Sequence, residues 1–363
     1  MKILHVEGGR NLYGGPHQVL LLMEGLKARG IENHLACRPG CQLAERAVAV
    51  ATVHPVPMRG DLDVSLIARL YRLIQNVKPD IVHLHSRIGA DVMGGLAARL
   101  GGTPVIHSRR NDNPESRWMV ALKYRLHDRV IAISEGIGRV LLSEGLPAAK
   151  LRYARDAVDA EEWQEPRDRD WFAQAFGIGP AQPVIGVVAQ LIPRKGHRYL
   201  IEAVARIVGD HPDLQVLFFG QGPQEVELIQ AIQDRGLERT IRLAGFRPDL
   251  PRILPCLDVL VHPALMEGMG VSLLQGACAA VPIIASRVGG IPEAVSAGET
   301  GILVAPADPL ELAGALARLL EDPGLRRCMG MAGRQRVMRE FSPQVMVEAN
   351  LAVYREVLRG GGA

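Results

Sequence analysis

Short apolar runs alternate with helical stretches along almost the whole of this chain, and this alternation limits its fold more than any other feature. Helices are predicted between the apolar runs, among them 15–29, 64–77 and 90–100. Strands that alternate with helices form parallel sheets covered by helices. The first half is therefore predicted to be a doubly wound α/β domain with strands at 2–6, 34–37, 51–56, 81–85, 104–107 and 129–133.

The alternation fails near 158–182, where a charged stretch precedes a short helix, and restarts at 184. A chain of 363 residues exceeds the ~250–300 residues at which single cores usually split. We therefore expect two Rossmann-like doubly wound parallel-sheet domains that face a central cleft. Strands of the second are predicted at 184–188, 215–219, 240–243, 259–261, 283–285 and 301–304. The expected divisions are domain 1–160, linker 161–182, domain 183–345 and a C-terminal helix, 346–363, that packs back toward the first domain.

Composition agrees with this fold class. Hydrophobic residues make up 48% of the chain and aromatic residues only 4%, which is typical of parallel α/β sheets. The five cysteines are an odd set, and Cys37 and Cys41 have no second pair to complete a zinc site. No apolar run approaches the ~18 residues that span a bilayer, and the N-terminus enters a strand at once. We expect reduced thiols, a cytoplasmic location, and no metal or other cofactor.

Charge is unevenly distributed. Residues 1–160 contain 22 basic and 15 acidic side chains, a balance of +7, and the rest of the chain has 20 and 24, a balance of −4. A basic first domain suits anionic lipid headgroups or a phosphorylated acceptor, although arginines spread over a solvated surface give the same count. Peripheral contact with an anionic membrane at its inner face is therefore one expectation, and nucleic acid is not an expected partner.

A glycine loop after an apolar strand is the most informative motif. Glu267 precedes Gly268, Met269 and Gly270, and a helix is predicted to follow. Unpaired N–H groups and the helix dipole at such a turn attract a diphosphate, while the carboxylate accepts hydrogen bonds from sugar hydroxyls. The motif therefore suits a nucleotide sugar. The alternative is an ordinary strand-to-helix turn that uses glycine for positive φ.

Two more loops follow predicted strands. The loop at 8–17 contains Gly14, Gly15 and His17, and it lacks the Gly-x-Gly-x-x-Gly spacing of a dinucleotide fold, which disfavours a dehydrogenase. The loop at 189–197 contains Lys195, which could place a cation on a departing diphosphate. A solvated surface lysine is the alternative there.

These motifs together resemble glycosyltransferase family 4, strongly over 184–345 and more weakly in the first half. The resemblance implies the GT-B fold and metal-independent transfer of a sugar from a nucleoside diphosphate sugar with retention of configuration. It depends on Gly14-Gly15, the segments at 80–85 and 131–134, Lys195-Gly196, and the segments at 219–223, 244–246, 258–263, 267–270, 282–285 and 288–293.

Carried over to this chain, the resemblance implies catalytic roles at the diphosphate and donor sugar for Lys195, Glu267 and Arg194. The implied donor-binding residues are Gly15, Gln190, Gly245, Phe246, Gly268, Met269, Gly270, Val271 and Gln275. Core packing is the alternative role for Phe246. The implied acceptor or cleft residues are Gly14, His17, His85, His107, Arg109 and Arg110.

Three positions depart from the family pattern. Gln275 stands where a second glutamate usually holds the donor ribose, and Gln190 replaces the usual diphosphate arginine, which Arg194 could bend back to supply. In the first domain, His107 arrives earlier than the family's histidine and Arg110 occupies the expected distance. The adjacent arginines 109 and 110 suit a phosphate, a carboxylate or an acidic sugar.

The pair His83 and His85 lies along a predicted strand, so the two side chains are expected on opposite faces, with His83 structural and His85 or Ser86 lining the cleft. The His-x-His spacing is a weak metal signal.

The predicted function is a retaining glycosyltransferase that uses a nucleoside diphosphate sugar, with UDP-sugars favoured, and a glycan or glycolipid acceptor. Two alternatives remain open. One is a catalytically silent nucleotide-sugar-binding partner subunit, because Gln190 and Gln275 replace charged residues. The other is a nucleotide-sugar epimerase, which would interconvert donors without any acceptor.

Overall fold

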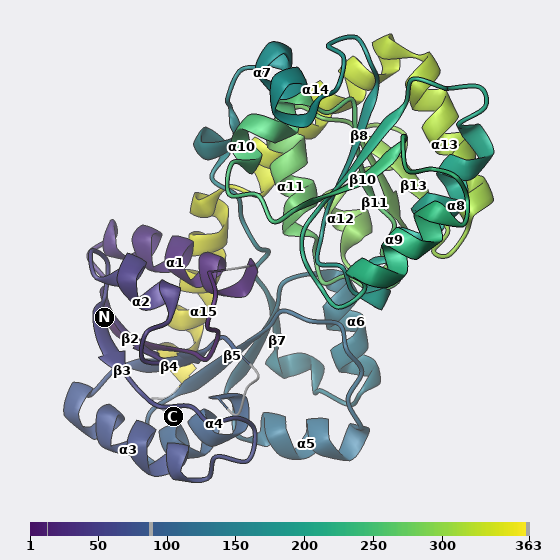
Figure 1. The fold of residues 1–363 in the computed structure, drawn as a ribbon. Helices are drawn as coiled ribbons and strands as arrows, with labels where there is room; N and C mark the ends of the chain where they lie inside the picture. Colours follow the sequence, from purple (N-terminus) through teal and green to yellow (C-terminus); the bar gives the residue numbers. More distant parts are fainter. Residues whose placement is uncertain (13, 87–89, 361–363) are drawn as a thin grey trace. The chain divides into compact units, whose positions relative to one another are not determined.

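A computed structural model describes residues 1–12, 14–86 and 90–360. The chain divides into two compact units: Met1–Ala157 with the C-terminal segment that begins at Pro343, and Val158–Ser342. Each unit contains one parallel sheet with helices packed around it (Figure 1). The two Rossmann-like α/β domains predicted from the alternation are confirmed. Residues 161–182, treated above as a linker, lie in the second unit.

The first unit contains a seven-stranded sheet, in the order β3-β2-β1-β4-β5-β6-β7, within the described residues. Its strands are β1 Lys2–Glu7, β2 Glu32–Cys37, β3 Thr52–Pro55, β4 Ile81–Leu84, β5 Val105–Arg109, β6 Arg129–Ala132 and β7 Leu151–Tyr153. Its helices are α1 Gly14–Lys27, α2 Gln42–Ala47, α3 Ser65–Val77, α4 Ala90–Leu100, α5 Arg117–Arg125, α6 Glu135–Ser143, η1 Ala148–Lys150 and α15 Pro343–Gly360.

The second unit contains a six-stranded sheet, β10-β9-β8-β11-β12-β13, in the described part of the chain. Its strands are β8 Val184–Val188, β9 Gln215–Phe219, β10 Ile241–Gly245, β11 Val259–His262, β12 Ile283–Ser286 and β13 Gly301–Val304. Its helices are η2 Ala160–Trp163, α7 Arg169–Phe176, η3 Pro193–Lys195, α8 His197–Ile207, α9 Glu225–Gln233, α10 Leu250–Ile253, η4 Leu254–Cys256, α11 Val271–Cys278, α12 Ile291–Ala294, α13 Pro309–Glu321 and α14 Pro323–Glu340.

Strand order reverses once in each sheet. In the first unit the chain builds outward from β1 through β2 to β3 and then returns to place β4 on the other side of β1. In the second unit the chain builds outward from β8 through β9 to β10 and then returns to place β11 on the other side of β8. Ligands of open α/β sheets bind at the carboxyl ends of the strands beside such a reversal. The fold therefore directs attention to the loops after β1 and β4 and after β8 and β11.

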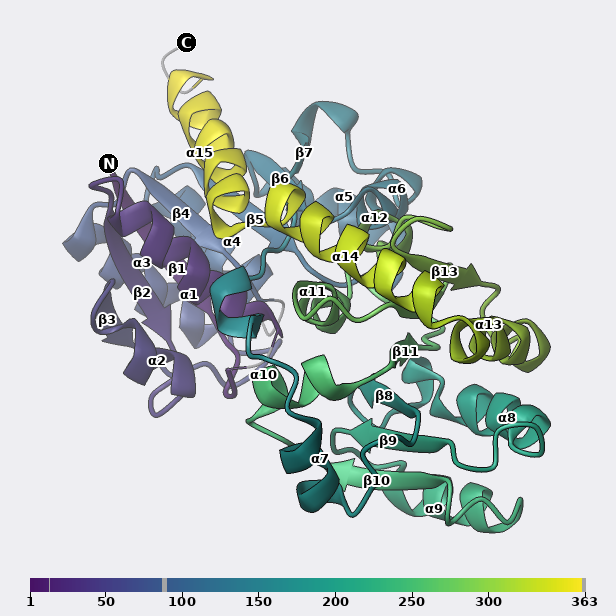
Figure 2. The ribbon, with the colours of Figure 1, turned by 90° about the horizontal axis from the view of Figure 1, so that it is seen from above.

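Helix α15 belongs to the first unit although it ends the described chain. It packs on α1, and its buried face shares a core with β1 and β6 (Figures 1 and 2). Val347 lies against Gly25 of α1, where a Cβ atom would come within 2.4 Å of it. No described helix is long and apolar enough to cross a membrane.

Candidate active site

The loop after β8 holds Lys195 in a buried position at the end of η3. Gly196 makes this possible, because its φ is 71° and a Cβ atom there would lie 1.9 Å from the carbonyl oxygen of Pro263. A residue with a side chain would push the two loops apart. This close approach brings Lys195 beside the loop that follows β11.

Glu267 is the partner of Lys195. Its Oε2 atom accepts hydrogen bonds from the Lys195 ammonium and from His262 Nε2, the second at 2.7 Å. The N–H of Gly268 donates to Oε1 at 3.2 Å. Burial raises the pKa of the Glu267 carboxyl, but the hydrogen bond from His262 and the charge of Lys195 outweigh burial, so the pKa lies well below its usual range. Glu267 is therefore ionised at neutral pH.

His262 ends β11 and is buried. Burial first, and then the charge of Lys195, lower the pKa of its imidazole, so the ring is neutral at pH 7. A neutral imidazole donates one hydrogen bond, and here Nε2 gives it to Glu267. The three side chains form one cluster, called here the Lys–Glu–His cluster, at the edge where β8 and β11 end.

The glycine loop leads from this cluster into α11. Gly268, Met269 and Gly270 are buried, and Gly270 precedes the helix with a φ of 82°. The first N–H groups of a helix have no partner within the helix. Val271 and Gln275 are half-buried on α11 itself. The backbone of this loop and the Lys–Glu–His cluster therefore lie together, as expected for a site that holds an anion and a polyol.

The other predicted donor residues lie nearer the surface. Gln190 and Arg194 are exposed, and Arg194 Nη1 donates to the carbonyl of Met266 at 3.4 Å, so its side chain bends toward the glycine loop. Gly245 ends β10 with a φ of 71°. Phe246 is 50% exposed. Core packing, the alternative role considered for Phe246, is therefore wrong.

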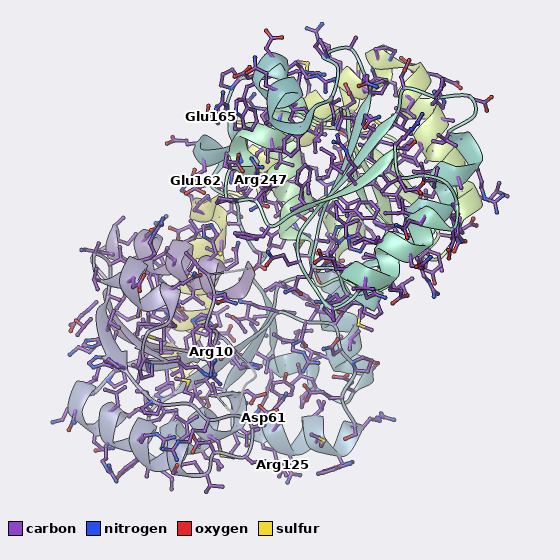
Figure 3. The ribbon with its side chains drawn as sticks, in the orientation of Figure 1. Arg10, Asp61, Arg125, Glu162, Glu165 and Arg247 are labelled. Atoms are coloured by element: carbon purple, nitrogen blue, oxygen red, sulfur yellow. The ribbon has the colours of Figure 1, made fainter. Side chains whose placement is uncertain are left out.

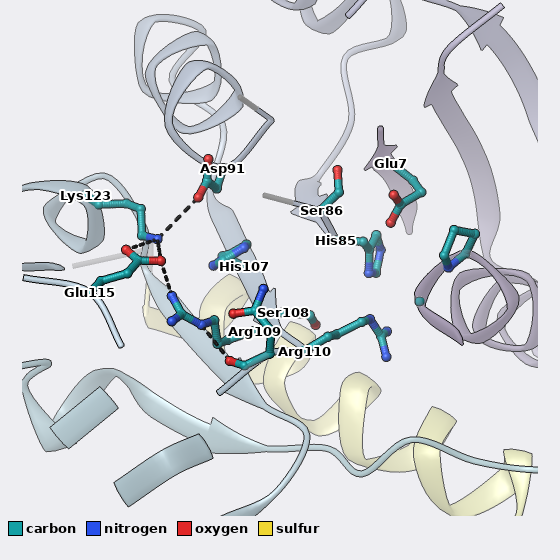
Figure 4. Close-up of a pocket in the computed structure, with 13 residues that line it drawn as sticks. Glu7, His85, Ser86, Asp91, His107, Ser108, Arg109, Arg110, Glu115 and Lys123 are labelled. Atoms are coloured by element: carbon teal, nitrogen blue, oxygen red, sulfur yellow. Dashed lines mark hydrogen bonds and ion pairs between the residues drawn. The ribbon is translucent and has the colours of Figure 1, made fainter. Parts of the chain in front are cut away.

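A pocket of about 170 Å³ lies at the corresponding edge of the first unit (Figure 4). Glu7 of β1, the segment after β4, and the segment 107–111 all line it. The predicted residues Gly15, His85, His107, Arg109 and Arg110 are among its lining, whereas Gly14 is exposed at the start of α1 and His17 is half-buried on that helix.

One wall of the pocket is an ion-pair network that Figure 4 draws with dashed lines. Lys123 Nζ lies 2.7 Å from a Glu115 oxygen and 3.3 Å from an Asp91 oxygen. Arg109 also pairs with Glu115, and its other N–H groups donate to the carbonyls of Asn111 at 2.9 Å and Asn113 at 2.5 Å. Arg109 is thus committed to holding this loop. A buried guanidinium needs these partners. The role of Arg109 toward an anionic acceptor stays a prediction.

Arg110 differs from its neighbour. Its Nη1 pairs with Asp156, while its buried Nε has no hydrogen-bond partner among the described residues. The side chain passes Gly15, where a Cβ atom would come within 3.4 Å of Arg110 Cδ. Arg110 therefore brings one unused N–H donor to the pocket lining.

The two histidines at the end of β4 and just after it are arranged differently from the prediction. His83 and His85 were expected on opposite faces, but their ring centroids are only 3.8 Å apart. The reason is that β4 ends at Leu84, so strand alternation no longer applies to His85. His83 bonds the hydroxyls of Tyr354 at 2.6 Å and Ser108 at 2.8 Å, which fits its predicted structural role.

His107 is buried, and burial, with smaller contributions from nearby charges, holds its pKa well below the usual range. Its Nδ1 has no partner within the described chain. His5, His83 and His85 also lie close enough for their ring nitrogens to fall within 4.8 Å of one another.

Sequence analysis missed several residues of both sites. His262 appears in the quoted motif 258–263 but received no role, although a histidine that ends an apolar strand just before the glycine loop was a usable signal. Glu7 likewise ends the first strand. Asp91 lies in α4, Glu115 in the loop before α5 and Lys123 in α5, and nothing in their spacing predicts that they meet.

Comparison with known proteins shows the family and the fold of this chain. The family described as "Glycosyl transferases group 1" matches residues 168–336, and the one described as "Glycosyltransferase Family 4" matches residues 14–162. The 2-deoxystreptamine glucosyltransferase of Streptomyces kanamyceticus is 30% identical over 298 residues, which cover 76% of this chain and 77% of the relative. The alpha-maltose-1-phosphate synthase of Mycolicibacterium smegmatis is 27% identical over 95% of this chain and 96% of the relative.

Among solved structures, HepE of Anabaena in complex with UDP superimposes with a TM-score of 0.87 at 20% identity, covering 98% of this chain and 100% of that one. The lipopolysaccharide outer core galactosyltransferase WaaB gives a TM-score of 0.74 at 16% identity over 98% of this chain and 100% of that one. Both likenesses concern the fold. Together with the family matches in both halves, they establish that this chain belongs to glycosyltransferase family 4 and has the GT-B fold.

Proposed function

We propose that this glycosyltransferase moves a sugar, with retention of configuration, from a nucleoside diphosphate sugar to a glycan or glycolipid acceptor. The observation that carries the proposal is the buried Lys–Glu–His cluster beside the glycine loop, which combines a cation for a diphosphate with a carboxylate for sugar hydroxyls. A UDP-sugar is the favoured donor, because HepE of Anabaena shares the fold and has structures with UDP and with UDP-glucose.

In the free protein Lys195 and Glu267 neutralise each other, so donor binding must separate them. Lys195 then turns to the diphosphate, where it opposes the charge that grows on the departing oxygen as the glycosyl bond breaks. Glu267 keeps its bonds from His262 and Gly268 and accepts hydrogen bonds from the donor sugar. After donor binding, Lys195 is paired with the diphosphate and Glu267 with the sugar hydroxyls, so neither charge is left without a partner.

Retention places the departing phosphate on the same face of the sugar as the attacking hydroxyl. The phosphate oxygen takes the hydroxyl proton as the new glycosidic bond forms, so the step needs no protein nucleophile. Lys195 and Arg194 offset the diphosphate charge, and we propose that the reaction uses no metal or other cofactor. Gln275 bonds the ribose, and the exposed ring of Phe246 stacks on the base.

A donor screen tests the proposal. Purified protein is incubated with UDP-, GDP- and ADP-sugars in the presence of EDTA, and free nucleoside diphosphate is followed over hours. Release from one donor, abolished in Glu267→Ala, is the expected result. Glu299→Ala is the control, because Glu299 precedes β13 at the opposite edge of the sheet. Release that requires added metal would contradict the metal-independent part.

A catalytically silent partner subunit is the second candidate, because Gln190 and Gln275 bring no charge to the donor site. Such a protein would bind UDP without ever releasing it from a donor, even with cell extract as a source of acceptors. Turnover of any donor in the same screen would exclude it.

We also propose peripheral contact with an anionic membrane through α5. Trp118, Met119 and Leu122 on this helix are 69%, 42% and 61% exposed, and Arg117 and Arg125 flank them, the latter extending outward in Figure 3. Apolar side chains beside arginines suit an anionic lipid interface. Sedimentation with phosphatidylcholine vesicles, with and without phosphatidylglycerol, should show binding that Trp118→Ser with Leu122→Ser removes. Val226→Ser, which changes another highly exposed apolar residue, should leave binding intact.

A further inference from the structure

A chain of hydrogen bonds runs from β2 into the pocket of the first unit, and its direction can be worked out atom by atom. It begins at Asn33, whose Nδ2 donates to the carbonyls of Met23 at 2.9 Å and Val50 at 3.2 Å. A flipped amide would set its oxygen against both carbonyls. The Asn33 Oδ1 atom must therefore be the one that lies 3.3 Å from His5 Nε2.

His5 is the second member. Burial lowers its pKa to about 4, so the ring is neutral at pH 7 and carries one proton. Because Asn33 Oδ1 can only accept, that proton is on Nε2. The other nitrogen, Nδ1, is left with a lone pair, and it lies 3.0 Å from His85 Nε2.

His85 is the third member and is only 3% exposed. Burial, and after it the neighbouring His83, hold its pKa well below the usual range, so it too has one proton. That proton must be on Nε2, since His5 Nδ1 accepts it. His85 Nδ1 therefore carries a lone pair, and it has no hydrogen-bond partner among the described residues.

The surroundings of His85 define what it can bind. Figure 4 shows His85, Glu7 and Arg110 along one side of the pocket and the Lys123 network on the other. On the His85 side, Nδ1 lacks a donor, and Arg110 Nε lacks an acceptor within the described structure. Burial raises the pKa of the Glu7 carboxyl despite hydrogen bonds and the charge of Arg110, which oppose this.

We propose that His85 Nδ1 accepts a hydrogen bond from a hydroxyl of an uncharged acceptor sugar, with His5 and Asn33 as the positioning residues that fix its tautomer. The identification of the ligand as an acceptor rests on the proposed function, whereas the tautomer does not. A hydroxyl can donate to Nδ1 and also accept from Arg110 Nε, whereas a phosphate or carboxylate would direct its own lone pairs at Nδ1. The pocket thus selects against anionic acceptors.

Nitrogen-15 NMR of the histidine-labelled full chain tests the tautomer. In the wild type we expect His85 to be neutral with Nε2 protonated and Nδ1 bare at pH 7. His5→Gln removes the acceptor that fixes this state, so Nδ1-protonated His85 should appear in that variant. A wild-type His85 protonated on Nδ1, or an unchanged His85 spectrum in His5→Gln, would overturn the relay.

Surrogate acceptors test the contact. Methyl α-D-glucopyranoside and myo-inositol serve as hydroxyl probes and inorganic phosphate as the anion probe. The hydroxyl probes should move the His85 Nδ1 resonance and phosphate should not; the reverse, or no change with any hydroxyl probe, counts against the proposal. His85→Gln retains a donor toward His5 but lacks an atom at Nδ1, so kcat/KM for the surrogate should fall about tenfold or more. Unchanged UDP binding shows that the variant is folded.

Two outcomes would distinguish the hydroxyl contact at His85 from the proposed function and from a metal site. If the donor screen gives no release from any donor while the Nδ1 resonance responds to hydroxyls, the proposed function fails and the hydroxyl contact survives. The two histidines of the relay, His5 and His85, could instead hold a metal ion together with His83. Elemental analysis that found one zinc ion per chain, lost in His5→Gln, would overturn the proposal in favour of that site.

Discussion

At the scale of single residues, both sites depend on charges that are buried and therefore partnered. Lys195 and Glu267 neutralise each other in the free protein, and His262 donates a hydrogen bond to Glu267. An unpartnered buried charge would cost several kcal/mol, so a ligand that separates the pair must replace each partner. A nucleotide sugar, with a diphosphate and several hydroxyls, can do both.

Lys195→Met should therefore lower turnover far more than donor affinity. Its charge opposes one that is largest in the transition state, and loss of such a contact typically costs about 10²–10³ in kcat. The dissociation constant of UDP should change much less. Single-turnover rates and calorimetric titration with UDP measure the two effects. Arg198→Met, which removes an exposed cation from α8, should change neither. Equal losses in rate and affinity would show that Lys195 binds donor and transition state alike.

The residues that sequence analysis identified are those whose role is local. Lys195 and Glu267 each follow a predicted strand, so the topology alone brings them to one sheet edge. His85 was expected at the cleft, but His5 and Asn33 could not be identified in this way, because their roles depend on which nitrogen carries a proton. That is decided by the carbonyls of Met23 and Val50, which no sequence spacing relates to them.

At the scale of elements, glycine sets how closely two loops approach. Gly196 and Gly236 have similar backbone angles, with φ of 71° and 64°, but only Gly196 is crowded: a Cβ atom there would lie 1.9 Å from Pro263, whereas nothing lies within 4 Å of one at Gly236. The strain of positive φ is common to both, about 1–2 kcal/mol. The clash with Pro263 occurs only at Gly196, in the loop that holds Lys195, and not at Gly236.

Gly196→Ala should consequently lose donor turnover and thermal stability together, while Gly236→Ala should lose only the smaller amount of stability that positive φ explains. Turnover of the donor found in the screen and melting by circular dichroism are the measurements. If Gly236→Ala lost as much activity as Gly196→Ala, strain and not the Pro263 contact would be responsible.

A helix or strand could be predicted from the sequence when its buried residues formed an apolar run or a periodic pattern. The interior strands β8 and β9 and the edge strand β13 were predicted with their observed bounds, because each is an almost continuous apolar run in the sequence. Strand β7 was not predicted. It has only three residues, Leu151–Tyr153, of which only Leu151 is buried, so it shows no apolar run.

At the scale of the whole molecule, the chain closes its first unit with its last helix. Glu356 of α15 bonds Arg129 of β6 at 2.9 Å and also bonds Arg152 of β7. The hydrogen bond from Arg152 is the largest cause that lowers the pKa of Glu356 to about 2, from an ordinary value of 4.5. Because the folded pKa is the lower one, the stability from this carboxylate is complete above the unfolded pKa and is lost as pH falls through the folded one.

Glu356→Gln should therefore lower the melting temperature of the first unit at neutral pH, by an amount that stays constant down to about pH 5 and disappears toward pH 2. The side chain is 34% exposed, so solvent screening keeps the effect modest. Glu348→Gln on the same helix is the matched control: Glu348 pairs with Arg29 at 2.7 Å and is 55% exposed, so its loss should matter less. Melting curves of both variants and the wild type across this range are the measurement. A Glu356→Gln effect that persisted undiminished at the lowest pH would mean that shape, and not charge, joins α15 to the sheet.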